Sequence, residues 1–185
     1  MKTVLALFLI LMFYAHAQED VIRIAMTAQL EAPQLRSSVT MDIDGETSTS
    51  IIDYVAPDRF RVQNETSEII VIGDTTYQND GNGWDILEVN MAAIINQYRN
   101  ASILEKITLS NLQVLTDETL DGKPCTVYSY TQDFEGIVSE DKLWVEKSTG
   151  LPLKLESQGD VLGTASRSVT LYDYDSGLEI AAPMQ

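Results

Sequence analysis

Alternation of apolar and polar residues is the main pattern of this chain. In "SSVTMDI", Val39, Met41 and Ile43 fall on one side, and Asp44-Gly45 follows as a hairpin turn. The same period of two recurs in "TSIIDYV", "DRFRV", "EIIVI", "LQVLTDETL", "CTVYSYTQ", "DKLWVEK", "LPLKLES" and "SRSVTLYDYD". The connections between these segments are short, whereas parallel strands need long crossovers, so the pattern predicts an antiparallel sheet.

Two stretches depart from this period and predict helices. Residues 19–31 have a helical composition and end before Pro33. Residues 86–107 carry an apolar stripe at helical spacing. The stripe consists of Leu87, Met91, Ile94, Ile95 and Tyr98. Because such a stripe must lie against an apolar partner, we expect it to cover the apolar face of the sheet.

These elements predict an α+β fold. A long antiparallel sheet with one apolar face twists and curls. Pro57 cannot donate a hydrogen bond to a strand ladder, so it suits a bend in such a sheet. We therefore expect a curved antiparallel sheet that forms an unclosed β-barrel, or half-barrel, with a helical lid. No repeat or linker divides residues 18–185, so a single domain is predicted.

The first seventeen residues resemble a secretory signal peptide. Lys2 supplies a basic start, residues 4–14 are apolar, and Ala15-His16-Ala17 fits a cleavage site. The alternative, an uncleaved anchor helix, is disfavoured because the apolar run is shorter than the roughly 20 residues that span a bilayer. We therefore predict an exported protein, periplasmic or extracellular, with residues 1–17 removed and no transmembrane span left. No cysteine follows the cleavage site, so no lipid attachment is expected there.

Composition excludes several classes of function. With 12 basic against 28 acidic residues and a formal net charge of −16, the chain should be repelled by nucleic acid. Cys125 is the single cysteine and His16, inside the predicted signal peptide, is the single histidine. The predicted mature chain therefore cannot form an internal disulfide, a Ser-His-Asp triad or a histidine metal site. No catalytic residue, metal or cofactor is predicted.

Carboxylates leave two weaker alternatives open. Acidic turns such as "NDGNGWD" do not match the spacing of a calcium-binding loop, so solvated turns are the preferred interpretation. An envelope hydrolase that uses two carboxylates is the other alternative. No pair in the sequence has an evident reason for a raised pKa, so this function is disfavoured.

Four segments carry a resemblance to a known family. "DYVAPDRFRV", "EIIVIGDTTYQNDGNGW", "LDGKPCTVYSY" and "KLWVEKSTGLPLKLES" follow one another in the order seen in bacterial envelope carriers. The chain resembles the outer-membrane lipoprotein-sorting (LolA/LolB-like) superfamily, which includes the LppX/LprG-like lipid-binding lipoproteins, from about Leu35 to Pro183. The resemblance implies an unclosed barrel whose hydrophobic cavity holds acyl chains without chemistry. Sorting chaperones carry an arginine before the strand proline, whereas this chain has Ala56.

The resemblance also implies a set of cavity residues. We predict that the cavity is lined by Tyr54, Phe60, Ile70, Trp84, Met91, Ile94, Tyr98 and Trp144. Core packing is the alternative role for each of them, since sheet faces and helix stripes usually form the core. The expected partner is a lipid or lipoprotein acyl chain, with an envelope protein as a further partner. The rival function is a periplasmic sensory or interaction module of the same fold that regulates an envelope stress response.

Overall fold

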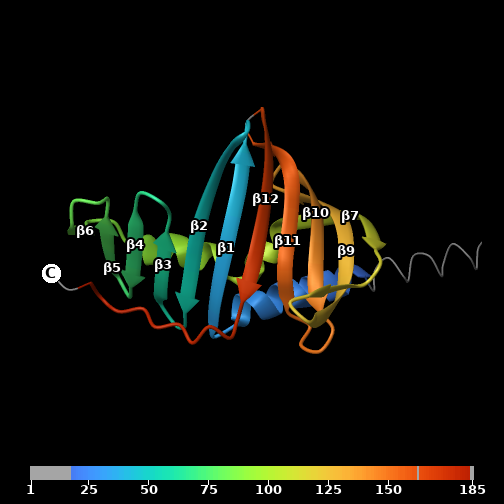
Figure 1. The fold of residues 1–185 in the computed structure, drawn as a ribbon, viewed down its shortest axis with the longest axis horizontal. Helices are drawn as coiled ribbons and strands as arrows, with labels where there is room; N and C mark the ends of the chain where they lie inside the picture. Colours follow the sequence, from blue (N-terminus) through green and yellow to red (C-terminus); the bar gives the residue numbers. More distant parts are fainter. Residues whose placement is uncertain (1–17, 162, 184–185) are drawn as a thin grey trace, which may run out of the picture.

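Twelve antiparallel strands form one sheet that curls without closing (Figure 1). The computed structural model describes residues 18–161 and 163–183, without the side chains of Tyr98 and Val161. The strand order is β6-β5-β4-β3-β2-β1-β12-β11-β10-β9-β7, and β8 pairs with β9. The strands are β1 Gln34–Ile43, β2 Glu46–Val55, β3 Arg59–Gln63, β4 Glu68–Ile72, β5 Thr75–Asn79, β6 Trp84–Leu87, β7 Ile107–Val114, β8 Glu118–Leu120, β9 Lys123–Phe134, β10 Ile137–Glu146, β11 Pro152–Val161 and β12 Thr164–Asp173.

The predicted hairpin turns explain most of this topology. Asp44 and Gly45, which join β1 to β2, have φ values of 55° and 84°. Asp-Gly is a favoured pair for a two-residue turn with positive φ at both positions, and its twist matches that of the flanking strands. The last strand then returns to the first, because β12 pairs with β1 in the register Val39 to Thr170. The prediction of an antiparallel, unclosed half-barrel with helices is confirmed.

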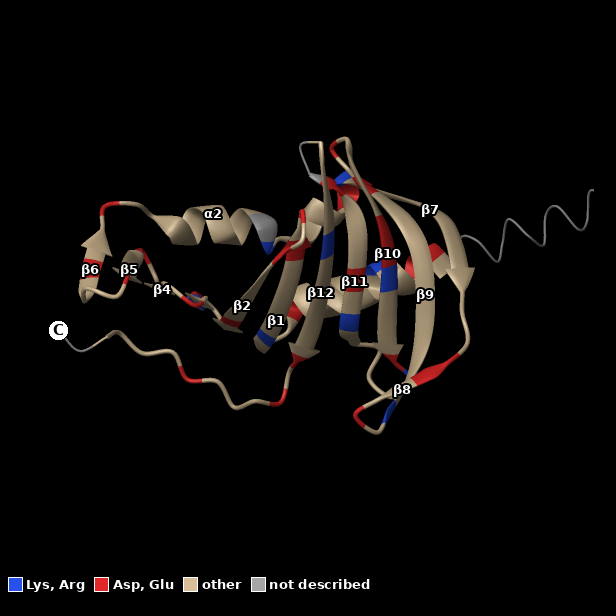
Figure 2. Ribbon diagram, turned by 45° about the horizontal axis from the view of Figure 1, so that its top comes forward, with Lys and Arg blue, Asp and Glu red and all other residues tan. Residues whose placement is uncertain are grey.

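Two helices lie on the same face of the sheet, here called the inner face (Figures 1 and 2). The N-terminal helix, described over residues 18–31, confirms the predicted helix at 19–31. It packs against β7, β9 and β10 in a cluster of Ile22, Ala25, Leu109, Tyr128, Tyr130, Leu143 and Val145. Helix α2, Met91–Tyr98, covers the other end of the sheet. There Ala92 is buried with Phe60 and Val71, and Tyr54, Ile69, Met91 and Ile95 pack around them.

The opposite, outer face is covered in part, by β8 and by segments before β8 and after β12. Trp144, Cys125, Val127 and Leu153 form a buried cluster there, with Leu115, Leu120 and Tyr174 packed against it. Beyond β12, the C-terminal segment runs past the ends of the strands from β1 toward β5 (Figures 1 and 2). The Gln34 side chain donates to the Tyr174 carbonyl at 2.9 Å, and Arg59 donates to the Ile180 carbonyl at 2.7 Å. Both faces of the sheet are therefore partly apolar.

The long helix predicted over residues 86–107 is wrong in its extent. The structure divides this stretch into the end of β6, helix α2 and a 3-10 helix, η1, over Ala101–Lys106. Asparagines mark the divisions, because the Asn90 side chain caps α2 by accepting from Ala93 N and Asn100 caps η1 by accepting from Ser102 N. Leu87 lies in β6 opposite Thr76, so the stripe that begins at Leu87 is not carried by one helix.

A matched pair of leucine variants tests the placement of the core. Leu143 on β10 is 2% exposed in the cluster beneath the N-terminal helix, whereas Leu171 on β12 is 51% exposed. Leu143→Ala should lower the free energy of unfolding by about 3 kcal/mol through lost burial and a residual cavity. Leu171→Ala should cost less than about 1 kcal/mol. Urea denaturation of both variants checks this, and equal costs would contradict the assigned inner core.

Candidate ligand-binding site

A largely apolar pocket lies between α2 and the inner face of β1, β2 and β3. Its volume is about 290 Å³, near the lower end of the roughly 300–1,000 Å³ typical of ligand sites. Ile52 and Ile94 are 38% and 46% exposed, which places them at its rim. The pocket is lined by Leu35, Ser37, Ile52, Tyr54, Phe60, Val62, Ile94, Ile95 and Arg99.

Strand register brings the sheet residues of this pocket together. Leu35 pairs with Tyr54, which pairs with Phe60, and directly paired residues share one face of the sheet. Ser37, Ile52 and Val62 form the parallel row beside them. The rings of Tyr54 and Phe60 are 5.0 Å apart between centroids and tilted by 36°. The floor of the pocket is therefore two cross-strand rows on three neighbouring strands.

Helix α2 is held over this floor mainly at its two ends. At its start, the buried Thr76 hydroxyl donates to the Val89 carbonyl at 2.9 Å, and Asn90 Nδ2 donates to Asp74 at 2.9 Å. At its end, Arg99 Nη2 donates to the Leu30 carbonyl of the N-terminal helix at 2.7 Å. With eight residues, α2 is too short to be stable alone, so its position depends on these bonds and on packing.

Arg99 brings a positive charge to the apolar pocket. Its Cζ atom lies 3.6 Å from the centroid of the Tyr54 ring, in a cation–π contact. Desolvation, the largest influence, lowers the pKa of Arg99 below its ordinary value, because the guanidinium is partly withdrawn from water. An arginine still keeps its proton at neutral pH. The pocket thus combines an apolar floor with one cationic wall.

The structure brings together half of the predicted cavity residues. Tyr54, Phe60 and Ile94 line the pocket, and Met91 packs in the cluster of Phe60 beside it. The Tyr98 side chain lies outside the described residues. Sequence reasoning missed Leu35, Ser37, Ile52, Val62 and Arg99. The two-residue alternation in β1 to β3 was the signal for the strand residues, while Arg99 had none, since its place depends on contacts far along the chain.

Three predicted residues lie away from this pocket, on the outer face. Ile70 pairs with Arg61, and Trp84 pairs with Asn79. Arg61 and Asn79 face outward, and directly paired residues share one face of the sheet, so Ile70 and Trp84 face outward as well. Trp144 is buried in the outer cluster, where its Nε1 donates to Glu118 at 2.9 Å. The structure therefore does not place Ile70, Trp84 or Trp144 with Tyr54 and Phe60.

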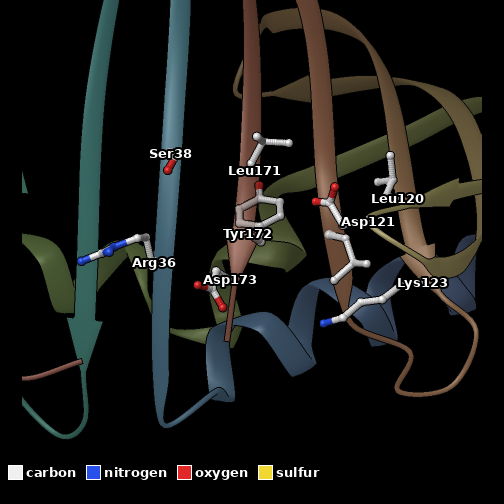
Figure 3. Close-up of a pocket in the computed structure, with 9 residues that line it drawn as sticks. Arg36, Ser38, Leu120, Asp121, Lys123, Leu171, Tyr172 and Asp173 are labelled. Carbon is white, nitrogen blue, oxygen red and sulfur yellow. The ribbon is translucent and has the colours of Figure 1, made fainter. Parts of the chain in front are cut away.

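The outer face carries a second, more polar pocket of about 340 Å³ (Figure 3). Figure 3 shows Lys123 and Leu120, from the hairpin of β8 and β9, on the same side as Leu171 and Asp173 of β12. Arg36 points away from them toward β2, where its Nε donates to Asp53 at 2.7 Å. The charge of Arg36 is thus engaged within the fold.

Asp53 holds two arginines on the outer face. Its side chain is fully buried and accepts hydrogen bonds from Arg36 and Arg61. Desolvation alone would raise the pKa of Asp53, but the hydrogen bonds from the two arginines outweigh it and lower the pKa below its ordinary value. The three side chains tie β1, β2 and β3 together behind the apolar pocket.

Neither a metal centre nor a membrane-spanning helix is found in the part of the chain that the structure describes. Over residues 18–161 and 163–183, no group of three or more histidine, cysteine, aspartate or glutamate side chains is placed to hold a metal ion. No helix in the same residues combines the length and apolar character needed to cross a membrane.

Comparison with known proteins gives a match in structure. No family model matches the chain, and no curated protein matches its sequence. The Mycobacterium tuberculosis lipoprotein LppX superposes with a TM-score of 0.65, over 89% of this chain and 98% of LppX, at 13% identity. The chain has the fold of LppX. Since LppX-like proteins belong to the superfamily that the sequence resembles, the predicted resemblance is confirmed at the level of fold.

Two further solved structures are similar over most of this chain. The MucA/MucB complex of Pseudomonas aeruginosa matches at 17% identity and a TM-score of 0.48, over 90% of this chain and 59% of that one. An outer membrane lipoprotein-sorting protein domain from Vibrio parahaemolyticus matches at 12% identity and a TM-score of 0.32, over 88% of this chain and 95% of the domain. These superpositions are looser than that of LppX, and nothing about function follows from them.

The buried carboxylate gives a pH-dependent prediction. The pKa of Asp53 is lower in the folded chain than in the unfolded chain, where it is about 3.9. The ionised carboxylate therefore stabilises the fold fully above the pKa of the unfolded chain, and this contribution is lost as the pH falls through the pKa of the folded chain. Asp53→Asn should cost about 2 kcal/mol at pH 7, less than for a fully buried pair because both arginines reach solvent. The difference from wild type should shrink below pH 4.

Chemical denaturation between pH 2.5 and 7 measures this difference. Asp175→Asn is the matched control, because Asp175 pairs with Lys123 at 3.4 Å but its side chain is 83% exposed. An exposed pair of this kind contributes little, so the control should follow wild type within about 0.5 kcal/mol at every pH. A cost of Asp53→Asn that does not vary with pH would contradict the assigned ion cluster.

Proposed function

We propose that this protein is an exported carrier or binding protein for an acyl chain of a lipid or lipoprotein, and that it performs no chemistry. The observation that carries the proposal is the apolar pocket between α2 and the inner face of β1 to β3. Apart from Ser37 and Arg99, its lining side chains are aliphatic or aromatic. Ligand sites are typically apolar with a few placed polar groups, and this pocket has that composition.

The energetics of burial favour an acyl chain in such a pocket. Each methylene transferred from water contributes about 0.8 kcal/mol, so about eight buried methylenes contribute roughly 6 kcal/mol. Loss of translational freedom and ordering of the chain offset part of this gain. The pocket already has exposed apolar residues, Ile52 and Ile94, at its rim. A ligand that covers them removes further apolar surface from water.

The lid can adapt to the size of the ligand. Helix α2 has no acidic residue in its first turn and no basic residue in its last, so its ends are stabilised by a cap and by tertiary contacts. Short, weakly packed elements belong to the less stable parts of a fold and open locally at low cost. We expect α2 to move away from β2 and β3 when a longer chain enters.

Export is part of the proposal. The predicted signal peptide, residues 1–17, lies outside the described residues. Cleavage after Ala17 would leave the described helix, residues 18–31, whole. This helix carries Ile22 and Ala25 into the inner core, so the mature chain would keep its core intact. LppX, whose fold this chain shares, is itself named a lipoprotein.

A rim substitution tests the pocket. Ile94→Asp places a charge at the mouth of the pocket on a side chain that is 46% exposed. It should weaken binding of a neutral fluorescent acyl ester by about tenfold or more, because a desolvated carboxylate is costly. The free energy of unfolding should change by less than about 1 kcal/mol, because half-exposed positions tolerate charge. Fluorescence titration and urea denaturation measure the two effects.

The matched control is Ile86→Asp, which adds the same charge on β6. Ile86 is 55% exposed and pairs with Tyr77 on the outward-facing side of the sheet. This variant should bind the acyl ester as wild type does. If delipidated wild-type protein binds no acyl probe, the carrier function fails and the sensory or interaction module becomes the better proposal. Equal losses in both variants would mean that the pocket beneath α2 is not the binding site.

Export gives a separate prediction about the mature chain. Protein recovered from the cell envelope should begin at Gln18 and carry no acyl group, because Ala15-His16-Ala17 fits a cleavage site that no cysteine follows. Intact-mass analysis of the exported protein measures this. Retention of Met1, or an added acyl mass, would contradict the assigned signal peptide.

A further inference from the structure

Arg99 is the one charged residue among those that line the pocket beneath α2. The rest of the lining is apolar except for Ser37. A charge placed in partly desolvated, apolar surroundings is unfavourable unless something compensates it. The residues around Arg99 therefore decide whether the fold itself satisfies this charge.

Most arginines of the described chain are paired with carboxylates. Arg23 pairs with Glu19, Arg36 and Arg61 share Asp53, and Arg167 lies 3.8 Å from Glu156. Among the described residues, no carboxylate lies within 4 Å of the Arg99 guanidinium, although the sequence holds 28 acidic residues. Arg59 also lacks a carboxylate partner in the described part of the chain, but it does not line the apolar pocket, so Arg99 is set apart by combining an unpaired charge with apolar surroundings.

The contacts that Arg99 does make hold it in place without neutralising it. Its Nη2 donates to the carbonyl of Leu30, in the last turn of the N-terminal helix, where carbonyl groups lack partners within the helix. Its Cζ atom lies 3.6 Å from the Tyr54 ring centroid. A guanidinium carries several N–H donors, and this carbonyl occupies few of them. Arg99 is thus held at the pocket wall, and its guanidinium keeps N–H donors that can bind a ligand.

We propose that Arg99 binds the anionic head of the acyl ligand, a carboxylate or phosphate, while the acyl chain fills the pocket over Phe60. The inference rests on the proposed acyl-binding function and adds to it the class of head group. A guanidinium presents paired donors that match the oxygens of a carboxylate or phosphate. The partly desolvated surroundings strengthen such a pair compared with one in water.

The arrangement of the pocket fits a ligand with one charged end. Tyr54 contacts both parts of the site, because its ring packs on Phe60 and also lies beneath Arg99. An acyl chain on the floor formed by Leu35, Phe60 and Val62 would therefore place its head beside the guanidinium. The excess of acidic residues in the chain makes this cation a selective contact, since anions would be repelled from most of the surface.

Matched probes test this inference with the whole protein. Delipidated wild-type protein is titrated with a fatty acid, with its methyl ester and with an acyl glycerol phosphate of the same chain length. Wild type should bind the fatty acid or the phosphate at least about tenfold more tightly than the ester. A preference for one of these anions identifies the head group as a carboxylate or a phosphate.

Two variants assign the preference to Arg99. Arg99→Gln should abolish the preference for the anionic probes, measured as the ratio of their affinities to that of the methyl ester in the same variant. Arg99→Lys should keep part of the preference, because it retains the charge but not the paired donors. Arg59→Gln is the control, since Arg59 donates to the Ile180 carbonyl on the outer face and should leave all affinities unchanged.

The outcomes separate this inference from the proposed function. If wild type binds the ester as tightly as the two anions, the role of Arg99 is overturned and acyl binding stands. If no probe binds, the acyl-binding function fails as well. If Arg99→Gln weakens every probe equally, Arg99 is a structural support of α2 and the inference is overturned. The comparison of probes on wild type needs no variant, so an unstable Arg99→Gln protein does not prevent the test.

Discussion

The structure depends on covering one face of a sheet that curls but does not close. Twelve strands lie side by side, and β6 and β7 end the strand order without pairing with each other. A closed barrel would bury its inward side chains against other strands, whereas here helices must remove them from water. The N-terminal helix does this thoroughly over β9 and β10, where Ile22, Leu143 and Tyr130 are at most 2% exposed. Helix α2 covers the inward side chains of β2 and β3 incompletely, and the apolar pocket is the result.

The two ends of the sheet are stabilised in different ways. The end under the N-terminal helix has an apolar core on its inner face and the Trp144 cluster on its outer face. The end under α2 has a smaller core, and its strands are joined from behind by Asp53 with Arg36 and Arg61. Because these ionic bonds lie on the outer face, they hold the pocket floor without filling the pocket.

The sequence allowed the strands, their antiparallel pairing and the Asp44-Gly45 turn to be predicted, because each depends on neighbouring residues. It did not allow the two faces of the sheet to be told apart. Ile70 and Trp144 have the same alternation as inward-facing residues, and the side chains that pack against the Trp144 cluster come from segments distant from Trp144 in sequence, namely Leu115, Leu120 and Tyr174. The extent of α2 was missed because apolar spacing continues through Asn90 and Asn100, where local capping ends one element and begins the next.

The position of Arg99 shows why the site needed the structure. The resemblance to lipoprotein-sorting proteins directs attention to the residue before the strand proline, and Ala56 there carries no charge. The cation at this cavity instead comes from the end of α2 and lies over Tyr54, two residues before Ala56. It also contacts Leu30, so one guanidinium links the lid, the sheet and the N-terminal helix. Because these contacts do not neutralise its charge, an anion bound as proposed above would share the guanidinium with the contacts that hold the end of α2. The proposed binding of ligand and the hold on α2 would then depend on the same side chain.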